Sequence, residues 1–311
     1  MSLIKGGVAL SIKFVKELME EIGFPEDARA YLALEYERLL NNNTYTDIFE
    51  NCKNRYFDDI EYGSVKNDLK SISDSAGLHI YTVHMLFLLH CAGRLLDEYV
   101  AHGMDRRLFV DLMCDLKYKL CECRTVYGIN GTFVFDWFHW HYLMKRFALG
   151  RFQYEKVRFG YREYASGYAR IKSGDEVCNF HIPSSGPLTP EATFDSFKKA
   201  YDFFGASDKG YLPLVCSSWL LYPPYKKVFP PKSNLEAFVE CFDVIDSGDS
   251  TSFADSWRIF GKPENTPISE LPASTRLQSA FLQYMHDGGR HGWGYGIILF
   301  DRERIINRNK K

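Results

Sequence analysis

Apolar residues recur every three or four positions along about the first 125 residues of the chain, which is the spacing of helices that bury one face. The first such run, over residues 8–22, stops at Gly23, Phe24 and Pro25. Glycine accepts the left-handed backbone that ends many helices, and proline cannot continue one. The pattern therefore predicts a helix ending near Gly23 and a second one from Pro25 to the polar run that begins at Asn41.

Three further helices are expected before residue 126. A short one covers Tyr45–Phe57, and two long apolar ones cover Leu78–Ala101 and Arg106–Cys123. The stretch 63–75 is rich in glycine, serine and lysine, so we expect a connector there. Residues 1–126 are therefore predicted to form a helical bundle.

The pattern changes near Tyr127, where short strand-like segments begin to alternate with helices. The strands are expected at Phe152–Phe159, Val177–Ile182, Tyr211–Cys216, Phe242–Ile245 and Ile297–Phe300. Two helix starts are marked by capping residues, Thr189 before Pro190 and Ser233 before Asn234. Residues 127–311 are therefore expected to be a second domain, and the fold class is α+β.

The composition and net charge limit the classes of partner that the protein is expected to bind. The 311 residues carry a net charge of −2, too little to gather nucleic acid or anionic lipid, so a small-molecule or neutral partner is expected. The most apolar window, Tyr81–Leu89, contains His84 and is about half the length of a membrane span, so no membrane association is expected. Eight cysteines without a CxxC pair indicate reduced thiols in a cytoplasm and no metal site.

His181 closes a predicted strand and precedes a Pro/Ser/Gly loop that leads into a helix. A histidine at such a strand end can take a proton from an ammonium group near neutral pH. The alternative is a structural histidine that bonds a loop carbonyl.

Cys216, Ser217, Ser218 and Trp219 are expected at a strand-to-helix turn, where backbone N–H groups can receive a phosphate. Cys216 activated by His181 could act as a covalent nucleophile, or it could be a small buried apolar residue. Trp219 is expected to anchor a core.

The glycine-rich segment Gly288–Gly296 resembles a phosphate cradle only in composition. Phosphate-binding glycines follow a strand and open a helix, whereas this segment follows a helix and precedes a strand. We therefore expect a turn.

Five segments together carry a resemblance to a known family. They are GRFQYEKVRF (150–159), NFHIPSSGPLTPEATFDSFKKAYDFF (179–204), CSSWLL (216–221), KSNLEAF (232–238) and LPASTRLQSAFLQYMHDGG (271–289). In order and context they resemble bacterial acyltransferase-domain proteins, which join a helical N-acyltransferase N-terminal domain to a GNAT-like C-terminal domain. The resemblance implies a mixed-sheet second domain and an acyl-CoA co-substrate, with acetyl-CoA as the first donor to expect.

The resemblance also implies roles for residues. GNAT enzymes pass an acyl group directly to an amine, using a base for the ammonium and an acid for the departing thiolate. His181 or Glu155 is the expected base, and Tyr154 or Tyr222 the expected acid. The pyrophosphate of the cofactor is expected at Cys216–Trp219, although the family's usual R/Q-x-x-G-x-G/A loop is absent.

Three polar residues, Arg151, Ser233 and Asn234, are expected to bind the acceptor, a small-molecule or peptide amine. Three functions stay open from sequence. They are an acyl-CoA-dependent N-acyltransferase, a degenerate GNAT fold that binds a ligand or partner without catalysis, and an enzyme that uses Cys216 covalently.

Overall fold

A computed structural model describes residues 2–58, 62–167, 169–208 and 210–307. The chain divides into two compact units, 1–147 and 148–311. This division lies later than the expected change near Tyr127, because the segment that follows α6 still packs on the helices. The Tyr142 hydroxyl, for example, donates a hydrogen bond to the Leu88 carbonyl at 2.6 Å.

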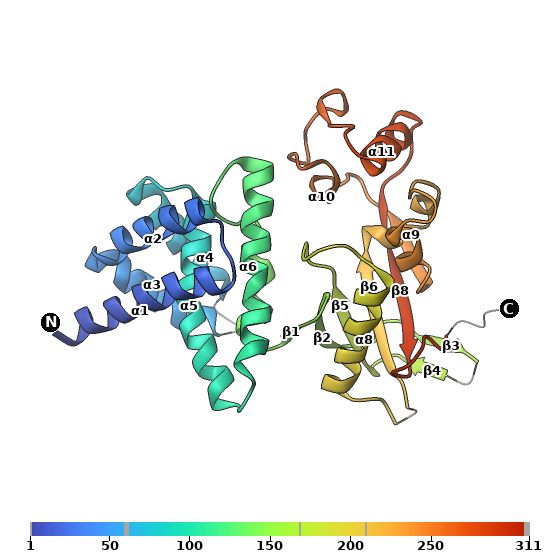
Figure 1. The fold of residues 1–311 in the computed structure, drawn as a ribbon, viewed down its shortest axis with the longest axis horizontal. Helices are drawn as coiled ribbons and strands as arrows, with labels where there is room; N and C mark the ends of the chain where they lie inside the picture. Colours follow the sequence, from blue (N-terminus) through green and yellow to red (C-terminus); the bar gives the residue numbers. More distant parts are fainter. Residues whose placement is uncertain (1, 59–61, 168, 209, 308–311) are drawn as a thin grey trace. The chain divides into compact units, whose positions relative to one another are not determined.

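The first unit is helical, as predicted (Figure 1). Its elements are α1 (Ser2–Glu21), α2 (Glu26–Leu40), α3 (Asn43–Tyr56), α4 (Tyr62–Ala76), α5 (Ile80–Ala101), α6 (Arg106–Tyr127), the 3₁₀ helix η1 (Phe135–Phe138) and α7 (His139–Tyr142). The prediction of a connector at residues 63–75 is wrong, because helix α4 covers this stretch. Val65, Leu69 and Ile72 are buried on one face of this helix, at a spacing that its glycine, serine and lysine residues obscured.

Helix ends in this unit follow the local chemistry. Gly23 takes a left-handed φ of 76° after α1, and Gly128 does so after α6 with a φ of 71°. Every residue of α5 from Met85 to Ala92 is buried, so this is the central helix of the unit.

Among the described residues, no single helix is long and apolar enough to cross a membrane. Helices α4 and α5 meet that test only as a pair, and the pair is bent by 119°.

The second unit is built around a mixed sheet. The strands are β1 (Arg146–Leu149), which spans the division between the units, β2 (Phe152–Arg158), β3 (Glu163–Ser166), β4 (Ala169–Lys172), β5 (Glu176–His181), β6 (Leu212–Ser218), β7 (Asp243–Asp249) and β8 (Gly292–Phe300). The helices are α8 (Pro190–Phe204), η2 (Trp219–Leu221), η3 (Pro223–Lys227), α9 (Asn234–Val239), α10 (Trp257–Phe260), η4 (Ile268–Glu270) and α11 (Arg276–His286). All five predicted strands exist, and the α+β fold class is confirmed.

The large sheet has the order β1-β2-β5-β6-β8-β7, and β3 and β4 form a separate hairpin. Strands β5 and β6 run parallel, whereas the pairs β2–β5, β6–β8 and β7–β8 are antiparallel. A parallel pair needs a crossover connection, which α8 supplies. In Figure 1 α8 lies beside β5 and β6.

Helices α8 and α9 cover one face of this sheet with aromatic side chains. Phe152 packs on Phe197 of α8 and on Phe238 of α9, with ring centroids 5.7 Å apart in both pairs. Thr189 caps α8 by accepting a hydrogen bond from the Ala192 amide at 3.2 Å, as the sequence predicted.

The opposite face carries a second apolar cluster, in which Val177, Val215 and Ile297 from three sheet strands pack with Tyr164 and Ile171 of the hairpin. Partly buried Val157 and Tyr295 pack against the same cluster. Because side chains alternate along a strand, the residues two positions from these point to this same face.

Candidate functional site

Four polar side chains lie together on the face that carries the second cluster. Gln153 and Glu155 come from β2, four and two positions before Val157, and Asn179 and His181 come from β5. In the antiparallel register Gln153 stands opposite His181, and Glu155 stands opposite Asn179. Directly opposed side chains in such a pair have Cβ atoms about 5 Å apart, so the four form one polar group.

A hydrogen-bonded triad organises this group. Oε1 of Glu155 lies 2.9 Å from Nε2 of His181 and accepts a hydrogen bond from Nδ2 of Asn179 at 3.0 Å. The Glu155 side chain is only 7% exposed, whereas that of His181 is 23% exposed. The imidazole is therefore the member of the triad that a substrate can reach.

This arrangement suits a general base. The carboxylate accepts a hydrogen bond from the Nε2–H group of His181, and this tautomer of the neutral ring has its lone pair on Nδ1. A buried carboxylate on one ring nitrogen also stabilises the imidazolium that forms when the other nitrogen takes a proton. The structure thus brings together His181 and Glu155, the two bases named from sequence, as one pair.

The polar row continues across the sheet. Asn179 is in register with Val215, so the next residues on this face are His181 of β5 and Ser217 of β6. Ser217 pairs in turn with Tyr295 of β8. Burial raises the pKa of Tyr295 well above its usual value, so the phenol keeps its proton at neutral pH and can donate a hydrogen bond to a developing negative charge.

Strands β5 and β6 pair only at Cys178–Leu214 and Asn179–Val215. The ladder between them therefore stops before the carboxyl ends of both strands, where His181 and Ser217 stand. In open α/β sheets ligands bind outside the carboxyl ends of the strands, where the polar row lies here.

The β5–α8 loop follows directly on His181 and is held in place by Arg151. The guanidinium donates to the Pro183 carbonyl at 2.7 Å, the Pro187 carbonyl at 3.2 Å and the Ser185 hydroxyl at 2.9 Å. This strand–loop–helix order, ending at the N-terminus of a 15-residue helix, can receive an anionic group on backbone N–H groups.

Tyr154, expected from sequence as the acid, is not part of the polar row. It lies between Gln153 and Glu155 on β2 and points to the opposite face, where its hydroxyl lies 2.8 Å from the Ser196 hydroxyl of α8. The side chain is fully buried. Alternation along the strand separates it from His181, so the structure removes it from the candidate site.

Cys216 is likewise on the face covered by helices and is 1% exposed. Burial raises the pKa of its thiol to about 12, and the imidazole of His181 lies on the other face of the sheet. The covalent mechanism through this pair is therefore not supported by the geometry.

The expected phosphate turn at Cys216–Trp219 is not a helix N-terminus of useful length. Strand β6 continues to Ser218, whose hydroxyl caps the three-residue η2 by accepting from the Leu220 amide at 3.2 Å. Trp219 packs against Tyr225, Phe253 and Phe281 in an aromatic core, as its core reading predicted.

Two other candidates have structural partners away from the row, and a third only begins a helix. Ser233 is the N-cap of α9, accepting from the Glu236 amide at 3.2 Å, and Asn234 is the first residue of that helix. Tyr222, the second expected acid, is 4% exposed and donates to Asp249 at 2.5 Å.

The glycine-rich segment does not form only a turn, because residues from Gly292 onward belong to β8. A Cβ at Gly294 would lie 2.2 Å from the Leu221 carbonyl oxygen. Glycine is needed there so that the η2 backbone can approach the sheet.

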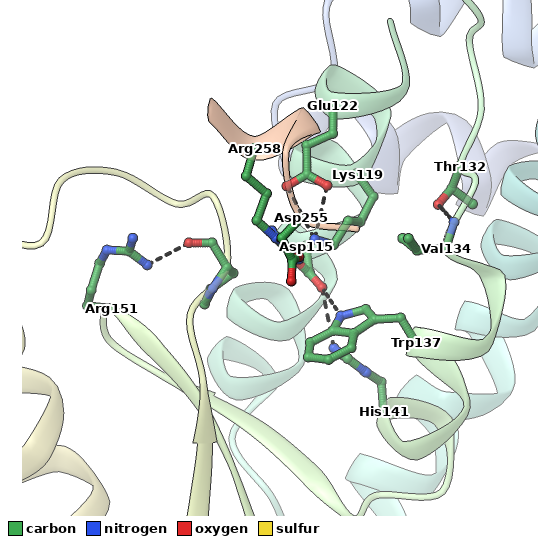
Figure 2. A network of polar contacts seen from close by, with 11 residues as sticks. Asp115, Lys119, Glu122, Thr132, Val134, Trp137, His141, Arg151, Asp255 and Arg258 are labelled. Atoms are coloured by element: carbon green, nitrogen blue, oxygen red, sulfur yellow. Dashed lines mark hydrogen bonds and ion pairs between the residues drawn. The ribbon is translucent and has the colours of Figure 1, made fainter. Parts of the chain in front are cut away.

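The first unit holds a polar network that sequence patterns did not indicate. Figure 2 shows Asp115 between Trp137 and His141. Its Oδ2 accepts a hydrogen bond from the indole N–H of Trp137 at 2.7 Å, and Nε2 of His141 lies 3.6 Å from the same oxygen. Lys119 on the next turn pairs with Glu122 at 3.0 Å. Burial opposes ionisation of Asp115, but the charge of Lys119 and the bonds from His141 and Trp137 hold its pKa well below the usual value. The network ties α7 and the preceding 3₁₀ helix to α6.

Among the described residues, no group of three or more His, Cys, Asp or Glu side chains is placed to hold a metal ion.

Two family models match the chain and together span most of it. Residues 13–144 match the N-acyltransferase N-terminal domain, and residues 147–298 match the GNAT-like C-terminal domain. The chain belongs to the family that joins these two domains. The resemblance stated from sequence is thereby confirmed.

Solved acyltransferase structures share the fold of this family member. A mutant acyltransferase in complex with octanoyl-CoA has a TM-score of 0.71 at 17% identity, over 92% of this chain and 87% of that chain. An acyltransferase with decanoyl-CoA and teicoplanin has a TM-score of 0.65 at 18% identity, over the same shares of the two chains. An acyltransferase in complex with decanoyl-CoA gives a TM-score of 0.68 at 18% identity, again over 92% and 87%. No curated protein sequence matches the chain.

Proposed function

We propose that this protein is an acyl-CoA-dependent N-acyltransferase in which His181, oriented by Glu155, is the general base. The observation that carries the proposal is the His181–Glu155 pair at the carboxyl end of a parallel strand pair, in a GNAT-like domain. Structural neighbours that hold octanoyl-CoA and decanoyl-CoA support the class of donor. A neighbour that holds teicoplanin supports a small-molecule acceptor.

The reaction uses the polar row in order. His181 Nδ1 takes one proton from the acceptor ammonium, and the amine lone pair attacks the thioester carbonyl. The C–N bond forms, the nitrogen loses its second proton to solvent, and the C–S bond breaks to release the coenzyme A thiolate. Tyr295 donates its phenolic proton to that thiolate and is reprotonated from solvent. The products are an amide and coenzyme A.

The donor's diphosphate is assigned to the β5–α8 loop and the N-terminus of α8 rather than to Cys216–Trp219. Arg151 keeps the loop in one conformation, and the macrodipole of α8 favours an anion at this end. In this proposal the β5–α8 loop, which the hydrogen bonds of Arg151 hold in place, takes the role that a glycine-rich motif has in other GNAT enzymes.

Calorimetric titration tests the donor site. Acetyl-CoA, octanoyl-CoA and decanoyl-CoA are titrated into the full chain and into Ser184→Asp, which adds a negative charge in the exposed part of the loop. The matched control is Ser173→Asp, an exposed position before the other end of β5. We expect binding that Ser184→Asp weakens at least about tenfold and Ser173→Asp leaves unchanged.

Coenzyme A release with a panel of amines then tests the reaction. Binding without turnover by any donor and amine would favour the ligand-binding alternative over the enzyme. The absence of binding by all three thioesters would overturn the proposed function.

A further inference from the structure

Gln153 is the one member of the polar group that the hydrogen-bonded triad does not use. Its side chain is 2% exposed, yet its Oε1 has no hydrogen-bond partner among the residues that the structure describes. A buried amide oxygen without a donor is uncommon in folded proteins, because removing it from water costs free energy that a hydrogen bond normally recovers.

The neighbours of Gln153 do not supply the missing donor. Asn179 directs its amide nitrogen to Oε1 of Glu155, and that same oxygen lies against Nε2 of His181. Thus the polar hydrogens nearest to Gln153 on β5 are already directed at a carboxylate. The donor for Oε1 must therefore come from outside the chain, from a bound substrate or from a water molecule.

The register places that group beside the general base. Gln153 and His181 are direct partners across the β2–β5 ladder, and the His181 side chain is 23% exposed. A donor held by Gln153 therefore lies within reach of the imidazole.

We propose that Oε1 of Gln153 accepts a hydrogen bond from the acceptor nitrogen and thereby selects primary amines. This inference rests on the proposed function and names its acceptor class. A primary ammonium carries three N–H groups. Two protons leave during the transfer, and the third remains on the amide product, so the bond to Gln153 persists from substrate to product.

Other nucleophiles lose this bond. A secondary amine gives a tertiary amide that has no N–H, so the amide oxygen of Gln153 loses its donor when the product forms. A hydroxyl loses its single proton, and the resulting ester oxygen would face Oε1 with a lone pair. The site therefore disfavours both secondary amines and alcohols.

Methylamine, dimethylamine and methanol are small probes that represent a primary amine, a secondary amine and an alcohol. Coenzyme A release from decanoyl-CoA is measured with each for the wild type, Gln153→Met and Gln153→Glu. Gln153→Met keeps the length of the side chain and removes the acceptor oxygen, whereas Gln153→Glu retains an oxygen acceptor.

A second buried glutamine provides the control. Gln278 is 9% exposed and fully used by the fold, since its side chain bonds the Ser274 and Thr275 amides and the Ile259 carbonyl. Gln278→Met should lower the melting temperature and leave the preference among the three probes unchanged. Gln153→Met breaks no bond within the chain, so its melting temperature should stay the same or rise.

We expect Gln153→Met to lower kcat/KM for methylamine at least about tenfold, to reduce the preference over dimethylamine, and Gln153→Glu to keep that preference. An unchanged preference in Gln153→Met would overturn the inference. A lowered melting temperature with equal losses for all three probes would also overturn it, because Gln153 would then be structural and its oxygen satisfied by water.

A binding measurement separates this inference from the proposed function. The ¹⁵N-labelled side-chain amide of Gln153 is followed by NMR during titration with methylammonium and, as a control, tetramethylammonium, which has no N–H group. A shift with the first cation alone supports the inference even if no thioester reacts. The absence of a shift with methylammonium would overturn it even if the enzyme acylates amines.

Discussion

The imidazole Nε2 of His181 lies 2.9 Å from Oε1 of Glu155. The two residues are on neighbouring antiparallel strands, although they are 26 positions apart in the sequence. This contact turns two separate candidate bases into one oriented pair. It also gives the proposed reaction its most direct test.

Replacing His181 by alanine should lower kcat about 10²- to 10⁴-fold, because proton removal from the ammonium then depends on water. Binding of decanoyl-CoA should change little. The measurement is coenzyme A release in a continuous thiol assay, paired with calorimetry of donor binding. His286→Ala, at the exposed end of α11, is the matched histidine control. Turnover within a fewfold of wild type in His181→Ala would rule out the assignment of the base.

Tyr295→Phe removes the proposed proton donor but keeps the aromatic ring, which packs on Tyr161 with a centroid distance of 4.8 Å. With acyl-CoA we expect a loss of about 100-fold in kcat, the lower end of acid catalysis. A thioester of a more acidic thiol, such as a thiophenol, needs no protonation of its leaving group. The same variant should therefore regain most of its rate with that donor, and an equal loss with both donors would exclude the acid role.

The first unit should lose stability in mild acid through His84. Burial lowers the pKa of this histidine to about 4 from its ordinary 6.5, its ring stacks on Phe135 with centroids 4.5 Å apart, and its Nδ1 has no hydrogen-bond partner among the described residues. The unfolded chain binds a proton at His84 below pH 6.5, whereas the folded chain does not until the pH approaches 4. Stability therefore falls between these values, by at most about 3 kcal/mol.

Urea unfolding at pH 7.5 and pH 4.5 checks this linkage. His84→Gln should show a smaller loss of stability between the two pH values than wild type, and His102→Gln, at an exposed position, should behave as wild type. If His84→Gln and wild type lose the same free energy of unfolding, another group is responsible.

Cys216 should be inert toward alkylation in the native protein, because its thiol is buried and its pKa is raised to about 12. Cys121 is exposed and should react with iodoacetamide first. Mass spectrometry of peptides after brief labelling measures both rates. Faster labelling of Cys216 than of Cys121 would restore the covalent mechanism.

Local signals were sufficient for much of the fold. The glycine after α1 and the threonine before α8 predicted a helix end and a helix start that the structure confirms. Helix α4 was missed because only its few buried apolar positions carried the period. Its small and polar residues matched the composition of a loop.

The alternation of side chains along the predicted strand already indicated that Tyr154 could not belong to the same site as Glu155. Neighbouring residues on a strand point to opposite faces, so Tyr154 and Glu155 could not share one site once β2 was predicted. Glu155 and His181 were named from sequence as alternative bases, and the contact between them was not predicted.

The sequence by itself determined much of the order of helices and strands, the family resemblance and the residue types available for catalysis, since these depend on local periodicity, capping and motifs. Only the tertiary structure decided that Gln153 faces His181, that Ser217 faces Tyr295, and that Cys216 faces away. Strand register arises from packing between segments far apart in the chain, and one residue of shift exchanges the two faces of a strand. The composition of the candidate site therefore depends on contacts that no local pattern specifies.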